Sequence, residues 1–180
     1  YMDTSDEWIS SRTGIKQRHV TTTQTTADLC GAVADHLLAD ASWSADSLDF
    51  IVVATMSPDY MTPATAAIVQ HHIQATNAFA FDLNAACSGF IYGLKVAGDL
   101  LRGGQKRGML IGGETLSKLV DWRERSTAVL FGDGAGGVLL ERVSDDDPSQ
   151  FMSSDLQTLG ELGDRLTAGY QPLTSPFATD

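Results

Sequence analysis

The fold of this 180-residue chain is decided by one stretch, Phe79-Ala-Phe-Asp-Leu-Asn-Ala-Ala-Cys-Ser-Gly-Phe90. Its apolar first part predicts a strand, and the residues from Cys87 onward predict a long helix. Cys87 stands at the corner between them, among small residues that leave room for a substrate. A helix N-terminus offers unpaired N–H groups and a partial positive charge, which favour a thiolate and help to bind an oxyanion. The residues alone leave two interpretations open: a nucleophile, or a buried thiol at a tight helix–sheet contact.

Strands and helices alternate on both sides of this stretch. Apolar runs between turn residues predict strands at 48–55, 77–83 and 108–113. Apolar residues at helical spacing predict helices at 26–41, 63–74 and 87–102. Thr25 and Asp28 have the spacing of a capping box, and Thr62 before Pro63 is typical of a helix start. The sequence therefore predicts an α/β fold with a mostly parallel sheet.

Other patterns in the sequence give further expectations. Residues 16–20 read as a short exposed strand, and Asp3, Thr4 or Ser5 is expected to cap a short helix that carries Trp8. The helix after Cys87 is expected to bury one apolar stripe, made of Phe90, Ile91, Leu94, Ala97, Gly98 and Leu101. The glycine cluster at 132–137 predicts close backbone approach or positive φ. It is not expected to bind a dinucleotide, since a strand-like run follows it where a helix would be needed.

Composition excludes several classes of function. A net charge of −11 argues against a nucleic-acid groove, which needs clustered Lys and Arg. Two cysteines are too few for a disulfide framework, and Cys30 lies on the apolar stripe of a predicted helix, as a core residue would. The spacing of the four histidines does not match that of zinc ligands. The apolar runs are too short to cross a bilayer and no secretory leader pattern opens the chain, so a soluble, cytoplasmic protein without membrane partner is expected.

Six segments resemble one family in their order and at about its spacings. They are Asp3-Thr-Ser-Asp-Glu-Trp-Ile9, Arg12-Thr-Gly-Ile15, Ile51-Val-Val-Ala-Thr55, Pro63-Ala-Thr-Ala66, Asp82-Leu-Asn-Ala-Ala-Cys-Ser-Gly-Phe90 and Phe131-Gly-Asp-Gly-Ala-Gly136. As a set they make residues 3–142 similar to β-ketoacyl-[acyl carrier protein] synthase III, the condensing enzyme that initiates type II fatty acid synthesis. The resemblance favours the nucleophile among the two interpretations of Cys87.

The resemblance implies a thiolase-like fold, with αβαβα layers in the complete protein and a homodimer as the usual assembly. Residues 1–142 correspond to the N-terminal half without its first strand, and residues 143–180 to the start of the connection toward a second half. The implied reaction transfers an acyl group, often acetyl, from acyl-CoA to Cys87. Malonyl-acyl carrier protein then loses CO2 and attacks the acyl-enzyme. Coenzyme A enters as a thioester substrate, and no cofactor is expected.

The resemblance also implies roles for individual residues. Trp8 and Arg125 match the positions that sandwich the CoA adenine, which suits an indole and a guanidinium because both stack on aromatic planes. Thr4 and Arg12 match positions near the CoA nucleotide. Phe131 matches a residue near the nucleophile. The position of Thr62 reaches toward the partner subunit's acyl pocket, and because several members carry a large aromatic there, threonine leads us to expect a longer or branched primer.

The histidine, asparagine and glycine loop that support condensation in the family have no counterpart by motif in this sequence. We therefore expect residues 1–180 alone to be inactive in condensation. Two alternatives stay open: a related condensing enzyme with another acceptor, and a non-catalytic or truncated thiolase-like subunit. A cysteine-redox protein is disfavoured, because no second cysteine lies near Cys87 in the sequence.

Overall fold

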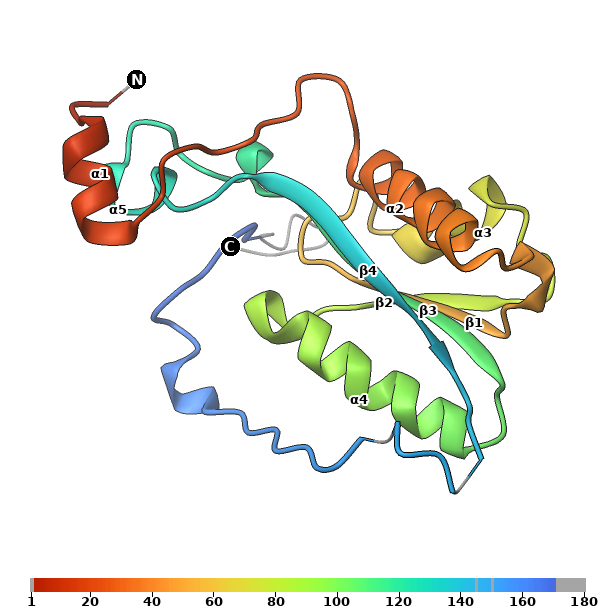
Figure 1. The fold of residues 1–180 in the computed structure, drawn as a ribbon. Coiled ribbons are helices and arrows are strands. Elements are labelled where there is room, and N and C mark those ends of the chain that lie inside the picture. The colour runs from red at the N-terminus through yellow and green to blue at the C-terminus, as the bar shows by residue number, and fades with distance from the viewer. Residues whose placement is uncertain (1, 145, 150, 171–180) are drawn as a thin grey trace, which may run out of the picture.

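A single sheet organises the part of the chain that the computed structural model describes, residues 2–144, 146–149 and 151–170 (Figure 1). Its strand order is β2-β1-β3-β4. The parallel strands are β1 (Phe50–Ala54), β2 (Phe79–Leu83) and β3 (Arg107–Thr115). The last strand, β4 (Asp133–Glu141), runs antiparallel to β3. The predicted mostly parallel α/β sheet is therefore confirmed.

Helices cover both faces of this sheet. The α-helices are α1 (Asp6–Thr13), α2 (Thr26–Ala41), α3 (Thr65–His72), α4 (Gly89–Arg102) and α5 (Arg125–Ala128). Single turns of 3₁₀ helix occur at Ala45–Ser47, Ala86–Ser88, Leu116–Lys118 and Gly160–Leu162. Figure 1 shows α2 and α3 on one face and α4 on the other. The short α1 and α5 lie side by side, away from the sheet's centre.

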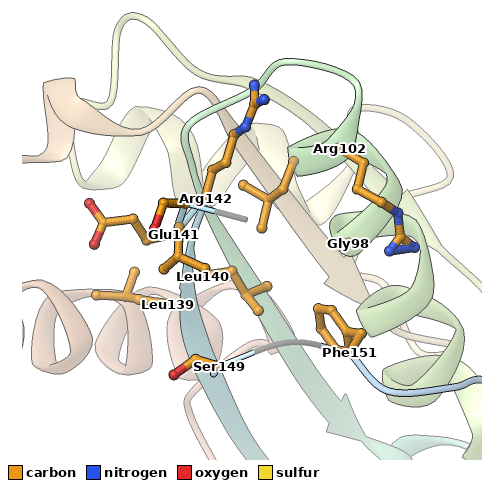
Figure 2. A pocket seen from close by; sticks show the side chains of 11 residues that line it. Gly98, Arg102, Leu139, Leu140, Glu141, Arg142, Ser149 and Phe151 are labelled. Carbon is orange, nitrogen blue, oxygen red and sulfur yellow. The ribbon is translucent and has the colours of Figure 1, made fainter. Parts of the chain in front are cut away.

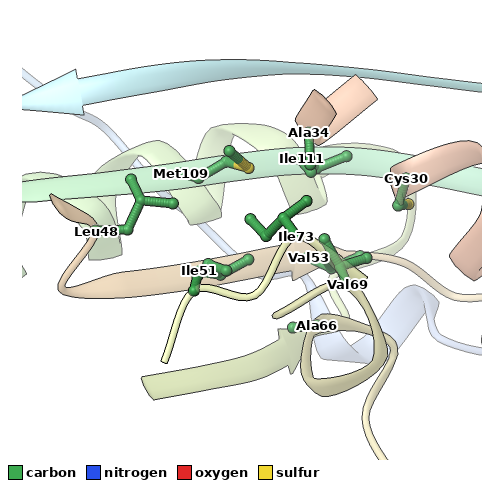
Figure 3. Close-up of a cluster of buried hydrophobic side chains, with 11 residues drawn as sticks. Cys30, Ala34, Leu48, Ile51, Val53, Ala66, Val69, Ile73, Met109 and Ile111 are labelled. Carbon is green, nitrogen blue, oxygen red and sulfur yellow. The ribbon is translucent and has the colours of Figure 1, made fainter. Parts of the chain in front are cut away.

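Alternation along the strands produces a core on each face, because successive side chains of a strand point to opposite sides. Towards α2 and α3, Val53 and Ile111 pack with the thiol of Cys30 (Figure 3). Towards α4, Val52 and Leu110 form the second cluster. All five residues of β1 are buried, as its continuous apolar run predicted.

Glycines allow α4 to lie close to the sheet. A Cβ on Gly93 would stand 2.5 Å from Cδ1 of Leu110, and one on Gly89 would stand 3.3 Å from Cβ of Ala54. The buried residues of α4 therefore include Gly89 and Gly93 as well as the predicted Ala97, Gly98 and Leu101. The prediction for Ile91 was wrong: its side chain is 56% exposed, because the small residues turn the helix so that their row faces the sheet.

Two predicted elements differ from those observed. Residues 16–20 are not a strand; instead this segment lies along the start of β4, where Asp133 N donates to His19 O at 2.7 Å. Helix α3 begins at Thr65 with Ala64 as N-cap, so the predicted start at Thr62 and Pro63 was wrong. Contacts with residues distant in the chain cause both differences.

Most of the glycine cluster at 132–137 lies in strand β4 and not in a connecting loop. Gly134, Gly136 and Gly137 lie inside β4, and none of the glycines from 132 to 137 has a positive φ. Close approach is the reason for two of them, since a Cβ on Gly132 would stand 2.9 Å from His19 O and one on Gly137 would stand 2.7 Å from Leu110 O.

Candidate functional site

Cys87 lies exposed on the turn that joins β2 to α4. The predicted corner is thus confirmed, although the regular helix begins at Gly89 and Cys87 belongs to the 3₁₀ turn before it. The backbone of Ala86 is in the left-handed region, with φ of 46°. For a residue with a Cβ this conformation costs about 1 kcal/mol or more, and such strained corners cluster at functional sites. Cys87 is exposed in the described chain, whereas the buried-thiol interpretation requires that α4 and the sheet cover it.

The peptide groups around Cys87 are held within the turn. Ala86 N donates to Asn84 Oδ1 at 3.1 Å, and Ser88 N donates to Ala85 O at 3.1 Å. These two N–H groups are therefore used, which leaves the Cys87 N–H as the candidate oxyanion donor proposed from the sequence.

Asp82 ties the strand before Cys87 to helix α3. Its carboxylate accepts hydrogen bonds from Thr65 N and Ala66 N, both at 2.7 Å. It thereby satisfies two of the unpaired N–H groups at the start of α3, a role that a local N-cap side chain usually fills. Sequence reasoning missed this role, and the signal available was one carboxylate inside an apolar strand.

Replacing Asp82 with alanine is expected to destabilise the protein by about 1–3 kcal/mol, because two N–H groups lose their acceptors. Denaturant unfolding measures the change. Asp46→Ala is the control, since the Asp46 carboxylate is exposed and accepts a bond from the Thr76 hydroxyl. Equal stability of the Asp82 and Asp46 variants would contradict this role.

Two arginine side chains lie against the ring of Trp8. The guanidinium carbon of Arg12 lies 4.4 Å from the centroid of the Trp8 ring, and that of Arg125 lies 4.3 Å away. Ser5 caps α1 by accepting from Trp8 N, and Arg125 Nη1 donates to Asp3 O at 3.0 Å, which joins α1 to α5. The indole ring can stack on an aromatic base, and the guanidinium groups can bind the phosphates of a nucleotide.

Of the remaining predicted site residues, Thr4 lies beside this cluster, between Asp3 and Ser5. In the part of the chain that the structure describes, Thr62 and Phe131 share no hydrogen bond, ion pair or ring contact with it. Thr4 is exposed just before the cap of α1, Thr62 is exposed in the loop between β1 and α3, and Phe131 is half-buried between α5 and β4. Among the described residues, no hydrogen bond, ion pair or ring contact joins Thr62 or Phe131 to Cys87.

Polar side chains gather where β1 and β3 end, near the Cys87 turn. Glu114 accepts a hydrogen bond from Met56 N at 2.9 Å and binds the hydroxyls of Thr55 and Ser57. Ligands in α/β folds bind at the carboxyl ends of the strands, which is the edge that this network and Cys87 share. The sequence offered no signal for the network, because Glu114 is at least 57 residues away from each of its three partners.

The second cysteine has a different environment. Cys30 is fully buried on α2, and burial, with smaller contributions from Asp82, Glu114 and Asp59, raises the pKa of its thiol from 9.0 to about 12. The prediction of an unreactive core residue is thus supported by its position.

Three further observations concern groups that the sequence analysis weighed. His36, His71 and His72 belong to α2 and α3, on the face of the sheet opposite α4. The described residues contain no group of three or more His, Cys, Asp or Glu side chains that could hold a metal ion. None of the helices in the described ranges combines the length and apolar character required to cross a bilayer.

A large cavity lies at the other end of α4 from Cys87. It measures about 970 Å³ and is bounded by the last turns of α4, the end of β4 and the residues that follow (Figure 2). Its lining includes the apolar side chains of Leu101 and Leu140 and the charged side chains of Arg102 and Arg142. It therefore forms no part of the Cys87 site.

Comparison with known proteins gives consistent matches. A family model described as "3-Oxoacyl-[acyl-carrier-protein (ACP)] synthase III" matches residues 81–160. The chain is 58% identical over 180 residues to a protein from Lactobacillus helveticus named beta-ketoacyl-[acyl-carrier-protein] synthase III. That match covers 99% of this chain and 55% of the relative, so the chain spans about half the length of the relatives it matches.

Solved structures agree with the sequence matches. The 3-oxoacyl-(acyl carrier protein) synthase III of Pseudomonas aeruginosa superimposes with a TM-score of 0.87 at 39% identity, over 97% of this chain and 54% of the other. The corresponding enzyme of Aquifex aeolicus gives 0.78 at 46% identity, over 80% and 47%. The predicted thiolase-like α/β fold is therefore confirmed, as is the resemblance of this chain, over about half of the family's length, to β-ketoacyl-[acyl carrier protein] synthase III.

Proposed function

We propose that this chain carries the nucleophile and part of the CoA site of a condensing enzyme that initiates fatty acid synthesis. The observation that carries the proposal is the exposed thiol of Cys87 on a strained turn at the carboxyl edge of the sheet, in a chain that matches synthase III relatives along its length. An exposed thiol on a rigid turn can attack the carbonyl carbon of an acyl thioester, and the acyl group moves to sulfur as the CoA thiol leaves.

The Trp8 cluster is the proposed binding site for the nucleotide end of acyl-CoA. The guanidinium of Arg125 lies over the indole ring, so Arg125 is proposed to move aside when the adenine binds and to stack on its other face. Arg12 lies beside the same ring and is the proposed phosphate partner, with Thr4 nearby in sequence. Phe131 is proposed to lie beside the acyl group at Cys87.

The partners proposed for the complete protein are acyl-CoA, malonyl-acyl carrier protein and a second copy of the chain. The edge of the described sheet supports the homodimer, because β2 ends the strand order and Phe79 on it is 45% exposed. A strand edge with an exposed aromatic is suited to pairing with another chain. A cytoplasmic location is part of the same proposal.

Acyl transfer from radiolabelled acetyl-CoA tests the function. The full-length protein is expected to retain label after denaturation, and the Cys87→Ser variant is expected to retain none, since a serine hydroxyl at this position lacks thiolate character. Cys30→Ser should retain label like the wild type, because Cys30 is buried. Absence of label from acetyl-CoA and from longer acyl-CoAs would favour a non-catalytic thiolase-like subunit.

Thr62 is expected to set the length of the primer. Replacing Thr62 with phenylalanine should reduce acylation by longer or branched acyl-CoAs roughly tenfold relative to acetyl-CoA, since a ring would fill space left by the small side chain. Competition between two acyl-CoAs measures the ratio, and Thr62→Ser is the control that keeps the side chain small. An unchanged chain-length preference in the phenylalanine variant would show that Thr62 does not line the pocket.

A further inference from the structure

Glu114 joins the ends of two strands at the edge of the sheet where Cys87 lies. It is the last but one residue of β3, and its carboxylate accepts a hydrogen bond from Met56 N at 2.9 Å and from Thr55 Oγ1 at 3.2 Å. The Ser57 hydroxyl binds the same carboxylate. These three donors follow directly after β1, so Glu114 fixes the first residues of the loop that leaves this strand.

A second layer of hydrogen bonds holds the same loop. Ser57 Oγ accepts from Thr115 N at 2.9 Å, and Ser57 N donates to Thr55 Oγ1 at 3.1 Å. On the far side, Thr26 Oγ1 donates to Ser57 O at 2.7 Å. Thr55, Ser57 and Thr115 are at most 5% exposed, so water does not compete for these bonds. The arrangement therefore holds residues 55–57, the start of the loop, at several points.

The end of β1 and the first residue of this loop contact both ends of the turn that carries Cys87. Thr55 N donates to Leu83 O at 3.1 Å, which extends the pairing of β1 with β2 to the last residue before the turn. At the other end of the turn, the backbone of Gly89 comes so near to Ala54 that an added Cβ would stand 3.3 Å from the alanine Cβ. Both ends of the turn thus rest on Ala54 and Thr55.

We propose that Glu114 is a positioning residue for Cys87. It holds Thr55, Met56 and Ser57 in place, and the adjoining end of β1 in turn fixes the two ends of the turn that presents the thiol. The inference rests on the proposed function, because acyl transfer gives Cys87 its role. The reactivity of the thiol can nevertheless be measured without any acyl donor, so the two proposals fail separately.

Asp49 provides a matched control at the opposite end of the same two strands. It lies just before β1, and its Oδ2 accepts from Lys106 N at 2.5 Å and from Arg107 N at 3.0 Å at the start of β3. Glu114 and Asp49 are both half-buried carboxylates that link β1 to β3. Removing either carboxylate should lower Tm, but only Glu114 binds the residues next to the Cys87 turn.

The experiment measures alkylation of Cys87 by iodoacetamide, followed by peptide mass spectrometry, in the full-length protein well below the lowest Tm. Glu114→Ala is expected to slow alkylation at least about fivefold, because a turn that has lost its support no longer holds the thiol in its exposed position. Glu114→Gln should restore the rate to within about twofold, because the glutamine oxygen can still accept from Met56 N and its NH2 group can donate to the hydroxyls of Thr55 and Ser57. Asp49→Ala should lower Tm and leave the rate unchanged.

The proposal is overturned by an unchanged or faster rate in Glu114→Ala, by equal slowing in Asp49→Ala, or by failure of the glutamine variant to rescue. If Glu114→Ala yields no folded protein, Ser57→Ala replaces it, since that change removes only the hydroxyl between the carboxylate and Thr115 N. It carries the same expected slowing, and an unchanged rate there counts equally against the proposal. None of these rates depends on whether acetyl-CoA acylates Cys87.

Discussion

In the folded protein, Cys30 is expected to react with iodoacetamide at least about a thousandfold more slowly at pH 8 than an ordinary exposed thiol, whereas Cys87 reacts readily. Only the thiolate is nucleophilic, and burial raises the pKa of Cys30 from 9.0 to about 12. At pH 8 this lowers the thiolate fraction from roughly one in ten to roughly one in ten thousand. The sign follows from the direction of the shift, since a raised pKa keeps the thiol protonated to higher pH.

A time course of alkylation, read separately for the peptides that contain each cysteine, measures this difference. The same reaction in denaturant is the control, because unfolding removes the burial that protects Cys30 and both thiols should then react alike. Comparable labelling of the two cysteines in the native protein would show that the α2 face opens readily, contrary to the packing of Cys30 against Val53 and Ile111.

Neighbouring glycines of β4 are expected to respond oppositely to alanine. Gly137→Ala should destabilise the protein by about 2–4 kcal/mol, because the new Cβ would stand 2.7 Å from Leu110 O and 3.0 Å from Cγ1 of Ile111. The first contact is with backbone, which cannot rotate away. Gly136→Ala meets nothing within 4 Å and should be neutral or stabilise by up to about 1 kcal/mol, since alanine loses less conformational freedom on folding.

Denaturant unfolding of the two variants beside the wild type tests the pair. Both glycines have ordinary φ values, so the difference in expected stability comes from space alone. Similar stabilities of the Gly136 and Gly137 variants would mean that β4 can shift away from β3, contrary to its nine-residue register.

Local signals predicted the elements that depend on local interactions. Helix α2 has the predicted bounds, and it begins at Thr26 because Thr25 and Asp28 cap each other within one turn. The buried strand β1 followed from an uninterrupted apolar run. The position of Cys87 at a strand-to-helix corner followed from the change of pattern at one point in the chain.

Other features depend on residues far apart in the chain, which no local pattern reports. The start of α3 is set by the carboxylate of Asp82, 17 residues from Thr65. Residues 16–20 take their path from β4, where the Asp133 carboxylate accepts from Thr21 N across 112 residues. The meeting of Trp8 with Arg125 was inferred from resemblance rather than from pattern, and the Glu114 network required the sheet itself.

Helix α4 also has a consequence for how this protein can change during evolution. The distance of Cys87 from the sheet depends on how closely α4 packs against the sheet. This packing is close because Gly89, Gly93 and Ala97 have no side chain or only a methyl group. Any enlargement at these positions would lift the helix and move the thiol with it. A library of variants randomised at these three positions and selected for thiol reactivity should therefore retain only the smallest residues. Positions that never contact a substrate would then tolerate as few residue types as the nucleophile itself.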